Sequence, residues 1–270
     1  MIDFVKMHGN GNDFVMIDEW DGSVVSNKTE FSSRYCDRRF GIGADGVIFV
    51  QRSDNADVRM VLYQPDGAEA EMCGNGVRCL LRYAVELGYV EPDRHVDVET
   101  VSGIRRSRYS SEDGFISVDM GTPSFDPEDV PAKRRIIQEE LEGYTVTACN
   151  TGVPHAVIFV DGVDTVDVEG EAPKIRHSGV FPEGANVNFV SESDDGYRVR
   201  TFERGVEAET WSCGTGSVAV AAVARKLGKA DDNVLIHTKG GDLEITFRDG
   251  KAFKRGPAER VYEGHIDVPF

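Results

Sequence analysis

The sequence predicts an α/β fold built from two similar halves, each a layer of strands wrapped around one buried helix. The first observation is a motif that occurs twice, as Met-Cys-Gly-Asn-Gly around Cys73 and as Ser-Cys-Gly-Thr-Gly around Cys213. An apolar segment follows each motif and ends at a glycine, Gly88 in the first case and Gly228 in the second. The cysteines and the glycines are each 140 positions apart. Each repeat therefore predicts a helix of about three turns with a cysteine at its start and a glycine C-cap.

The second observation is that other segments recur in the same order in the two halves. The repeated pairs are residues 67–71 and 205–209, residues 43–45 and 184–186, and the residues Gly9 and Asn12 with Gly152 and His155. Several matches in one order, together with the cysteine motifs, indicate a duplication. We therefore expect two homologous halves with an active-site cleft between them.

The third observation concerns the helices that follow the cysteines. Residues 77–87 and 218–224 are apolar on nearly all sides, which is typical of a buried helix. The first N–H groups of a helix have no intrahelical partner, and the helix dipole places about half a positive charge there. Such an end binds carboxylates and favours a thiolate over a thiol. One cysteine in this position can be an activated nucleophile, and two that face one site can be a base and an acid.

In the first half, alternating or continuous apolar runs predict strands, and helical spacing of Phe31 and Tyr35 predicts a helix ended by Gly41. The loop at residues 8–13 is richer in amide side chains than a turn requires, and residues 64–67 are a turn by composition. The predicted strands are residues 2–7, 14–17, 47–50, 58–63, 96–100, 104–109 and 115–120, and the helix is residues 29–39.

The second half begins after a Pro/Asp/Glu-rich segment, residues 121–131, which is typical of an interdomain linker. Residues 136–141 fit a helix or a strand equally well. The predicted strands are residues 144–148, 156–160, 187–190, 197–202, 207–211, 234–238 and 242–247. We predict domains at residues 1–118 and 119–257, with a tail from about residue 258 to residue 270 that packs back on the first domain.

Composition excludes several classes of protein. No apolar run approaches the roughly 20 residues of a membrane span, and the chain begins as a strand without a basic leader, so we expect a cytoplasmic protein. Five cysteines without closely spaced pairs argue against a disulfide scaffold or a metal cluster. The net charge of −17 argues against nucleic acid and anionic membranes as partners. This charge fits either an ordinary acidic protein or one adapted to high salt.

At this point the residues resemble the diaminopimelate epimerase family of cofactor-independent amino-acid racemases, over essentially the whole chain. The run around the first cysteine is the most specific part, because its Asn75 and Arg78 distinguish it from the Cys-Gly-His motif of proline racemases. The segments that carry the resemblance are residues 6–9 (KMHG), 11–14 (GNDF), 72–79 (MCGNGVRC), 154–155 (PH), 185–186 (AN), 203–205 (ERG) and 212–216 (SCGTG).

The resemblance implies interconversion of LL- and meso-diaminopimelate in lysine biosynthesis, without pyridoxal phosphate, any other cofactor or a metal. It also implies two pseudo-symmetric domains, each a closed, mostly antiparallel sheet around a central helix. One of Cys73 and Cys213, as a thiolate, would remove the α-proton, and the other, as a thiol, would return a proton to the opposite face. Backbone amides at the two helix ends would stabilise the carboxylate of the carbanion; they belong to Gly74, Asn75, Gly214 and Thr215.

The resemblance assigns further residues. His155 and Glu203 would tune the thiols, and Tyr262 resembles a tyrosine at a homodimer contact. The substrate ligands it implies are Asn12, Gln64, Asn186, Glu203 and Arg204. Three positions depart from the family pattern: Gln64 and Val153 replace asparagine, and Gly46 replaces the glutamine of some members.

These departures leave two alternatives to the epimerase: a racemase of another amino acid, and a two-domain protein that binds an amino acid without catalysis. For single residues, the structural alternatives are a buried cysteine with no chemical role and, for Glu203 and Arg204, a surface ion pair. We expect Cys36, Cys79 and Cys149 to be structural.

Overall fold

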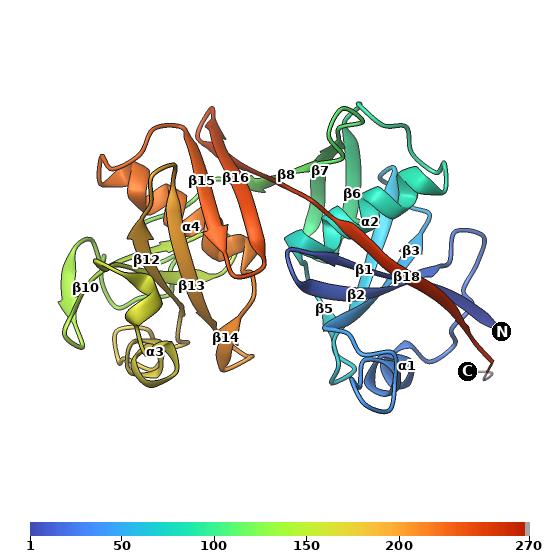
Figure 1. Ribbon diagram of the computed structural model, residues 1–270, viewed down its shortest axis with the longest axis horizontal. Helices are drawn as coiled ribbons and strands as arrows, with labels where there is room; N and C mark the ends of the chain where they lie inside the picture. Colours follow the sequence, from blue (N-terminus) through green and yellow to red (C-terminus); the bar gives the residue numbers. More distant parts are fainter. Residues whose placement is uncertain (268–270) are drawn as a thin grey trace. The chain divides into compact units, whose positions relative to one another are not determined.

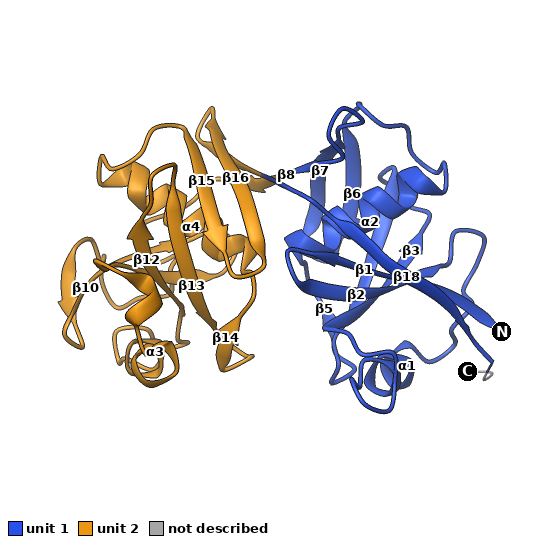
Figure 2. Cartoon of the chain, in the orientation of Figure 1, with its two compact units in different colours: residues 1–118, 255–270 blue, residues 119–254 orange. Residues whose placement is uncertain are grey.

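The computed structural model describes residues 1–267 and divides them into two units, coloured separately in Figure 2. Unit 1 comprises Met1–Val118 and the chain from Arg255 onward, and unit 2 comprises Asp119–Lys254. Residues 121–131, predicted as a linker, belong to unit 2, where the backbones of Ser124 and Asn150 are hydrogen-bonded to each other. The last three residues of the predicted tail, 268–270, lie outside the described residues.

Unit 1 contains two helices and a set of strands (Figure 1). The elements are β1 (Ile2–Gly9), β2 (Asn12–Asp18), α1 (Lys28–Tyr35), β3 (Gly46–Gln51), β4 (Val58–Tyr63), β5 (Glu69–Ala70), α2 (Gly74–Glu86), β6 (Val96–Thr100), β7 (Gly103–Tyr109), β8 (Ile116–Gly121) and, from the end of the chain, β18 (Glu259–Ile266). β8 begins in unit 1 and ends in unit 2, and β17 (Lys251–Gly256) begins in unit 2 and ends in unit 1.

Unit 2 repeats this order of elements. They are β9 (Glu139–Leu141), β10 (Tyr144–Asn150), β11 (Pro154–Phe159), the 3-10 turn η1 (Val163–Thr165), α3 (Val168–Arg176), β12 (Asn186–Glu192), β13 (Tyr197–Glu203), β14 (Ala208–Thr210), α4 (Gly214–Lys226), β15 (Asn233–Thr238), β16 (Gly241–Arg248) and β17 (Lys251–Gly256).

The strand pairing is the same in the two units. In unit 1, β1–β2, β3–β4, β4–β5 and β6–β7 are antiparallel, whereas β2–β3 and β4–β6 are parallel. In unit 2, β10–β11, β12–β13, β13–β14 and β15–β16 are antiparallel, whereas β11–β12 and β13–β15 are parallel. β9 pairs with β10 as β18 pairs with β1. The predicted α/β class is confirmed, and the ladders repeat as the duplicated sequence does.

The registers correct one detail of the repeat. In the parallel ladders, Phe14 lies opposite Gly46 and His155 lies opposite Asn186. Phe14 is therefore the structural counterpart of His155, and the sequence match of Asn12 with His155 is wrong. The mismatch arises because the loop before β2 and the loop before β11 differ in length, which sequence spacing alone does not reveal.

The two cysteine helices lie among the strands of their units. Helix α2 packs against β1, β2, β3, β4 and β7, and α4 packs against β10, β11, β12, β13, β15 and β16 (Figure 1). Each helix is followed by a glycine at positive φ, +73° at Gly88 and +71° at Gly228, as the C-cap prediction required. A second helix covers the opposite face of the sheet in each unit. In unit 1 this helix is α1, which packs Phe31 into the core, and in unit 2 it is α3, which packs Ile175 into the core.

Some elements differ from the sequence predictions. Helix α1 ends at Tyr35 instead of residue 39, because the Cys36 N–H makes the last helical bond to Ser32 and residues 37–41 form a turn. The ambiguous segment 136–141 contributes strand β9. Helix α3 was not predicted, and it contains Pro173, which disfavours a helix interior. None of the helices in residues 1–267 combines the length and apolar character of a membrane span.

Candidate functional site

The half-site in unit 1 is the N-terminus of α2. Cys73 is the N-cap residue, and its extended backbone turns the sulfur toward the helix end, where it accepts a hydrogen bond from the Gly76 N–H at 3.5 Å. The first intrahelical bond runs from the Val77 N–H to the Cys73 carbonyl, so the amides of residues 74–76 point out of the helix. Asn12 lies beside the thiol, with its Oδ1 3.4 Å from Cys73 Sγ and 3.4 Å from Asn75 Nδ2.

A cluster of charges fixes Asn12. Its amide nitrogen donates to Asp45 at 2.8 Å, and Arg38 bridges Asp45 and Asp13 with contacts of 2.7 Å to each. Lys6, which is buried, completes the cluster through Asp13. Burial alone would raise the pKa of Asp13, but hydrogen bonds from Arg38 and Lys6 and their charges outweigh it and lower the pKa to about 2. This support for Asn12 was not predicted from the sequence.

Arg78 ties the loop after β1 to helix α2. Its side chain is completely buried and donates to Asn75 Oδ1 at 2.8 Å, to Asn10 Oδ1 at 2.5 Å and to the Pro257 carbonyl at 2.8 Å. Burial lowers its pKa to about 10. A Cβ atom at Gly9 would lie 2.8 Å from the guanidinium, which explains why glycine stands there. Arg78 thus holds the Asn75 side chain, at the tip of the helix, in place.

The half-site in unit 2 is the N-terminus of α4. Cys213 is its N-cap, and the buried sulfur lies 3.4 Å from the Gly216 N–H and 3.4 Å from the Thr215 hydroxyl. Burial, followed by the negative charge of Glu203, raises the pKa of the Cys213 thiol. The hydrogen bonds from Thr215 and Gly216 and the charge of Lys254 oppose this rise without cancelling it.

His155 connects this helix tip to the sheet. It is fully buried on β11, with Nε2 3.0 Å from the Thr215 hydroxyl and Nδ1 3.1 Å from the Asn188 amide nitrogen. Burial, and then the positive charge of Arg204, lowers its pKa to about 3. His155 is therefore a neutral imidazole at any pH near neutrality.

Three further predicted residues lie at the start of β12 and the end of β13. Asn186 lies opposite His155 in the ladder, and its Oδ1 accepts a hydrogen bond from the Arg204 backbone N–H at 2.7 Å. The Arg204 guanidinium lies 3.4 Å from the Glu183 carbonyl, and the Glu203 carboxylate accepts a hydrogen bond from the Thr210 hydroxyl at 2.5 Å. The end of β13 thus brings both charged residues toward the start of β12.

Two predicted residues lie apart from the helix tips within unit 1. Gln64 is exposed in the turn after β4, where its backbone N–H bonds to the Ala68 carbonyl. Tyr262 lies on β18 with its ring against Phe4 and its hydroxyl 3.4 Å from the Ile42 carbonyl. The other three cysteines, Cys36, Cys79 and Cys149, are buried, and burial raises the pKa of each to about 12.

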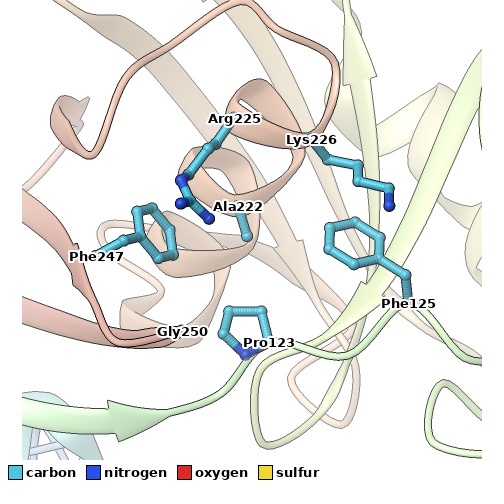
Figure 3. A pocket seen from close by; sticks show the side chains of 7 residues that line it. All are labelled: Pro123, Phe125, Ala222, Arg225, Lys226, Phe247 and Gly250. Carbon is cyan, nitrogen blue, oxygen red and sulfur yellow. The ribbon is translucent and has the colours of Figure 1, made fainter.

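A cavity of about 440 Å³ in unit 2 is separate from this site (Figure 3). It lies at the C-terminal end of α4, 12 residues beyond Gly214 and so about 18 Å from the cysteine end. Arg225 lies over the Phe247 ring and is paired with Asp232, and Lys226 lies over Phe125. Within residues 1–267, no three His, Cys, Asp or Glu side chains are grouped to hold a metal ion.

A model of the diaminopimelate epimerase family matches residues 4–125 and 147–261. The chain belongs to the diaminopimelate epimerase family. It is 52% identical over 275 residues to the diaminopimelate epimerase of Methanocella arvoryzae, covering 100% of this chain and 98% of that one. It is 54% identical to the diaminopimelate epimerase of Methanothrix thermoacetophila, covering 98% and 96% of the two chains. The predictions of the family and of an epimerase are confirmed.

More distant solved structures share the fold. A phenazine biosynthesis protein of the PhzF family from Bacillus anthracis has a TM-score of 0.73 at 17% identity, over 99% of both chains. A probable proline racemase from Agrobacterium radiobacter has a TM-score of 0.68 at 18% identity, over 99% of this chain and 93% of that one. The diaminopimelate epimerase family thus shares its fold with proteins of other names, so the assignment rests on the sequence relatives.

The charge cluster behind Asn12 leads to a prediction about stability. Because the folded-state pKa of Asp13, about 2, lies below its ordinary value of 3.8, the ionised carboxylate stabilises the fold above about pH 4 and loses this effect as the pH falls toward 2. Asp13→Asn should lower the free energy of unfolding by about 2 kcal/mol near neutral pH. Denaturant titrations of both proteins between pH 7 and pH 3 measure this difference, which should shrink on acidification.

Asp21→Asn is the matched control, because Asp21 pairs with Arg52 at an exposed position. It should change stability little at any pH. A constant deficit of Asp13→Asn across the whole pH range would contradict an ionic role for Asp13.

Proposed function

We propose that this chain interconverts LL- and meso-diaminopimelate by proton transfer between two cysteines, without pyridoxal phosphate. The observation that carries the proposal is the repeated geometry of α2 and α4, in which a cysteine caps a buried helix and accepts a glycine N–H through sulfur. Inversion at a carbon needs a base on one face and an acid on the other, because a single base tends to return the proton to the face it left. A duplicated fold supplies two such groups.

The helix ends also supply the stabilisation that the reaction requires. The α-proton of an amino acid is far less acidic than a thiol, so the carboxylate of the carbanion must be bound strongly. The amides of Gly74 and Asn75 and of Gly214 and Thr215 are donors of this kind, and each well-placed donor contributes about 3 kcal/mol in a site that excludes water. No step requires a metal or an electron-withdrawing cofactor.

The two cysteines differ in their surroundings, which suggests their roles. Burial and Glu203 raise the pKa of Cys213, so we propose that it rests as a thiol and returns the proton, while Cys73 removes it in the same direction of turnover. Cys73 is only partly buried, and its thiol donates to Asn12 Oδ1 at 3.4 Å, so this contact must break before Cys73 acts as the base. In the reverse direction the two roles exchange, since the protonation states have exchanged.

The remaining site residues are proposed substrate ligands. A diaminopimelate molecule carries an ammonium and a carboxylate at its distal end, and Glu203 and Arg204 offer the complementary charges. Asn12 and Asn186 supply amides next to the helix tips, and Gln64 is the least supported ligand because its side chain is exposed in a turn. Val153 cannot form a side-chain hydrogen bond, so a racemase of another amino acid remains the second candidate.

The decisive experiment is incubation with LL-diaminopimelate in D2O. The proposal predicts deuterium at one α-carbon of the product, and Cys73→Ser and Cys213→Ser should each reduce turnover by about 10²-fold or more, because serine is too weak an acid and base. Mass spectrometry and chiral chromatography of the product measure both effects. In parallel incubations with other amino acids, label that appears only in one of them favours the second candidate, and no label in any amino acid favours a binding protein.

The control for these variants is Cys79→Ala, since Cys79 lies in the interior of α2 and faces the core. It should retain turnover within a few fold. Folded Cys73→Ser or Cys213→Ser protein that turns over at the unmodified rate would exclude the two-thiol scheme.

We infer that the chain forms a homodimer through β18. This strand pairs with β1, and its exposed side chains include Val261, 54% exposed, and Tyr262, 44% exposed. Tyr262→Glu would place a charge in an apolar contact, so it should convert a dimer to a monomer in light-scattering measurements. Val101→Glu, at a position 59% exposed in unit 1, is the control and should leave the dimer intact. A dimer that survives Tyr262→Glu would place the contact elsewhere.

We also infer adaptation to high salt from the excess of 47 acidic over 30 basic residues. Salt shortens the range of repulsion from about 10 Å at 0.1 M to about 3 Å at 1 M. The temperature of unfolding, followed by circular dichroism, should therefore rise as KCl increases over this range. KCl is preferable to sulfate, which strengthens hydrophobic burial in any protein. A constant unfolding temperature would indicate an ordinary acidic surface.

A further inference from the structure

We propose that Asn188 and Thr201 are positioning residues that hold His155 in the tautomer protonated at Nε2, so that Thr215 directs its hydroxyl proton at Cys213. This inference rests on the proposed two-cysteine function. It gives a functional role to two buried side chains that do not contact Cys213.

The orientation of the Asn188 amide follows from its two fixed neighbours. One terminal atom lies 3.2 Å from the Ala156 carbonyl oxygen, which can only accept, so that atom is the nitrogen. The other lies 3.0 Å from the Thr201 hydroxyl, which donates to the amide oxygen. Both contacts agree, and Asn188 is fully buried, so neither water nor another partner competes for them.

The orientation of Asn188 determines the tautomer of His155. The same Asn188 nitrogen lies 3.1 Å from His155 Nδ1, so it donates its second hydrogen there and Nδ1 must be the unprotonated nitrogen. The neutral ring then carries its hydrogen on Nε2. The opposite tautomer would bring two donors face to face in the protein interior, where neither finds another acceptor.

The tautomer in turn orients Thr215. Nε2–H donates to the Thr215 oxygen at 3.0 Å, so the hydroxyl keeps its own hydrogen for another acceptor. Cys213 Sγ lies 3.4 Å from that oxygen and also accepts the Gly216 N–H at 3.4 Å. The result is a directional chain from Thr201 through Asn188, His155 and Thr215, with its donors pointing toward sulfur.

The backbone of unit 2 leaves space for this chain of hydrogen bonds. Unit 1 has no equivalent chain of hydrogen bonds at the matched positions. A Cβ atom at Gly216 would lie 2.5 Å from Asn188 Oδ1, so only glycine allows the amide to approach. The strand registers place Phe14 where His155 stands and Ile48 where Asn188 stands. Both lie near Gly76, and neither has a hydrogen-bonding side chain. This chain of hydrogen bonds is therefore present behind Cys213 and absent at the matched positions behind Cys73.

The chemical consequence is that His155 stabilises a charge without exchanging a proton. When Cys213 returns a proton to the carbanion, the S–H bond breaks, a C–H bond forms at the α-carbon, and the electron pair stays on sulfur. The thiolate then accepts the Thr215 O–H and the Gly216 N–H, while both ring nitrogens of His155 keep their states. Glu203 and Lys254 are the charged groups that act on Cys213 besides this relay, and Arg204 acts on His155.

The first test is the tautomer itself, in the resting wild-type protein. Long-range proton–nitrogen spectra of protein labelled with ¹⁵N-histidine should show one of the six histidines with a protonated Nε2 and an unprotonated Nδ1, unchanged between about pH 5 and pH 9. His155→Gln should remove this signal and so assign it. A protonated Nδ1 at His155 would overturn the inference. This measurement requires no turnover, so it can fail while the two-cysteine function holds, or hold while that function fails.

The second test is a double-mutant cycle. Asn188→Leu and Thr215→Val should each lower kcat about tenfold with a smaller change in KM, because Thr215→Val removes the hydrogen bond to the charged sulfur and Asn188→Leu removes the contact that fixes the His155 tautomer behind it. Each should also move alkylation of Cys213 by iodoacetamide, followed by peptide mass spectrometry, to higher pH. The double variant should have a kcat no lower than that of either single variant, since both substitutions break the same chain of hydrogen bonds.

Conservative variants complete the design. Thr215→Ser and Thr201→Ser keep the hydroxyls and should restore the wild-type pH profile of alkylation. Additive losses in the double variant, in proteins with unchanged circular dichroism, would show that Asn188 acts only on packing and would overturn the relay.

Discussion

The structure depends on one local constraint: a helix that begins inside the protein must find partners for its first N–H groups. In both units a cysteine caps the helix, and its sulfur accepts the glycine N–H three residues later. At these largely buried ends the cysteine sulfur accepts one of the donors, and the remaining amides are left for an anion. The same geometry that permits the fold thus prepares a thiol and a carboxylate site next to each other.

Much of this arrangement was predictable because it is encoded locally. The spacing of Cys73 and Cys213, the apolar helices and the glycines after them fixed the repeat without any long-range information. The strand registers were harder to predict from the sequence. Sequence spacing matches Asn12 to His155, but the strand ladders match Phe14 to His155. Pairing between strands depends on the whole sheet. Two loops of different length misalign residues that are matched by sequence spacing, and composition does not reveal this difference.

The residues that support the site were harder to find than the residues in it. Asn188 stands among Val187, Phe189 and Val190, and an amide inside such an apolar strand is a signal that a buried hydrogen-bond partner exists. The sequence does not say which partner it is. Arg38 and Asp45 are ordinary surface types, and their action on Asn12 appears only when three separate segments meet.

The two units keep one strand pairing and differ in the buried residues behind their helix tips. Matched places hold Phe14 and His155, Ile48 and Asn188, and Asn75 and Thr215. Two identical half-sites would hold two thiols of equal acidity, and neither protonation state would be preferred. In the proposed two-cysteine mechanism, the unequal surroundings favour one of the two singly deprotonated forms of the resting cysteine pair. Duplication supplies the pair of helix tips, and divergence of their buried neighbours makes that pair asymmetric.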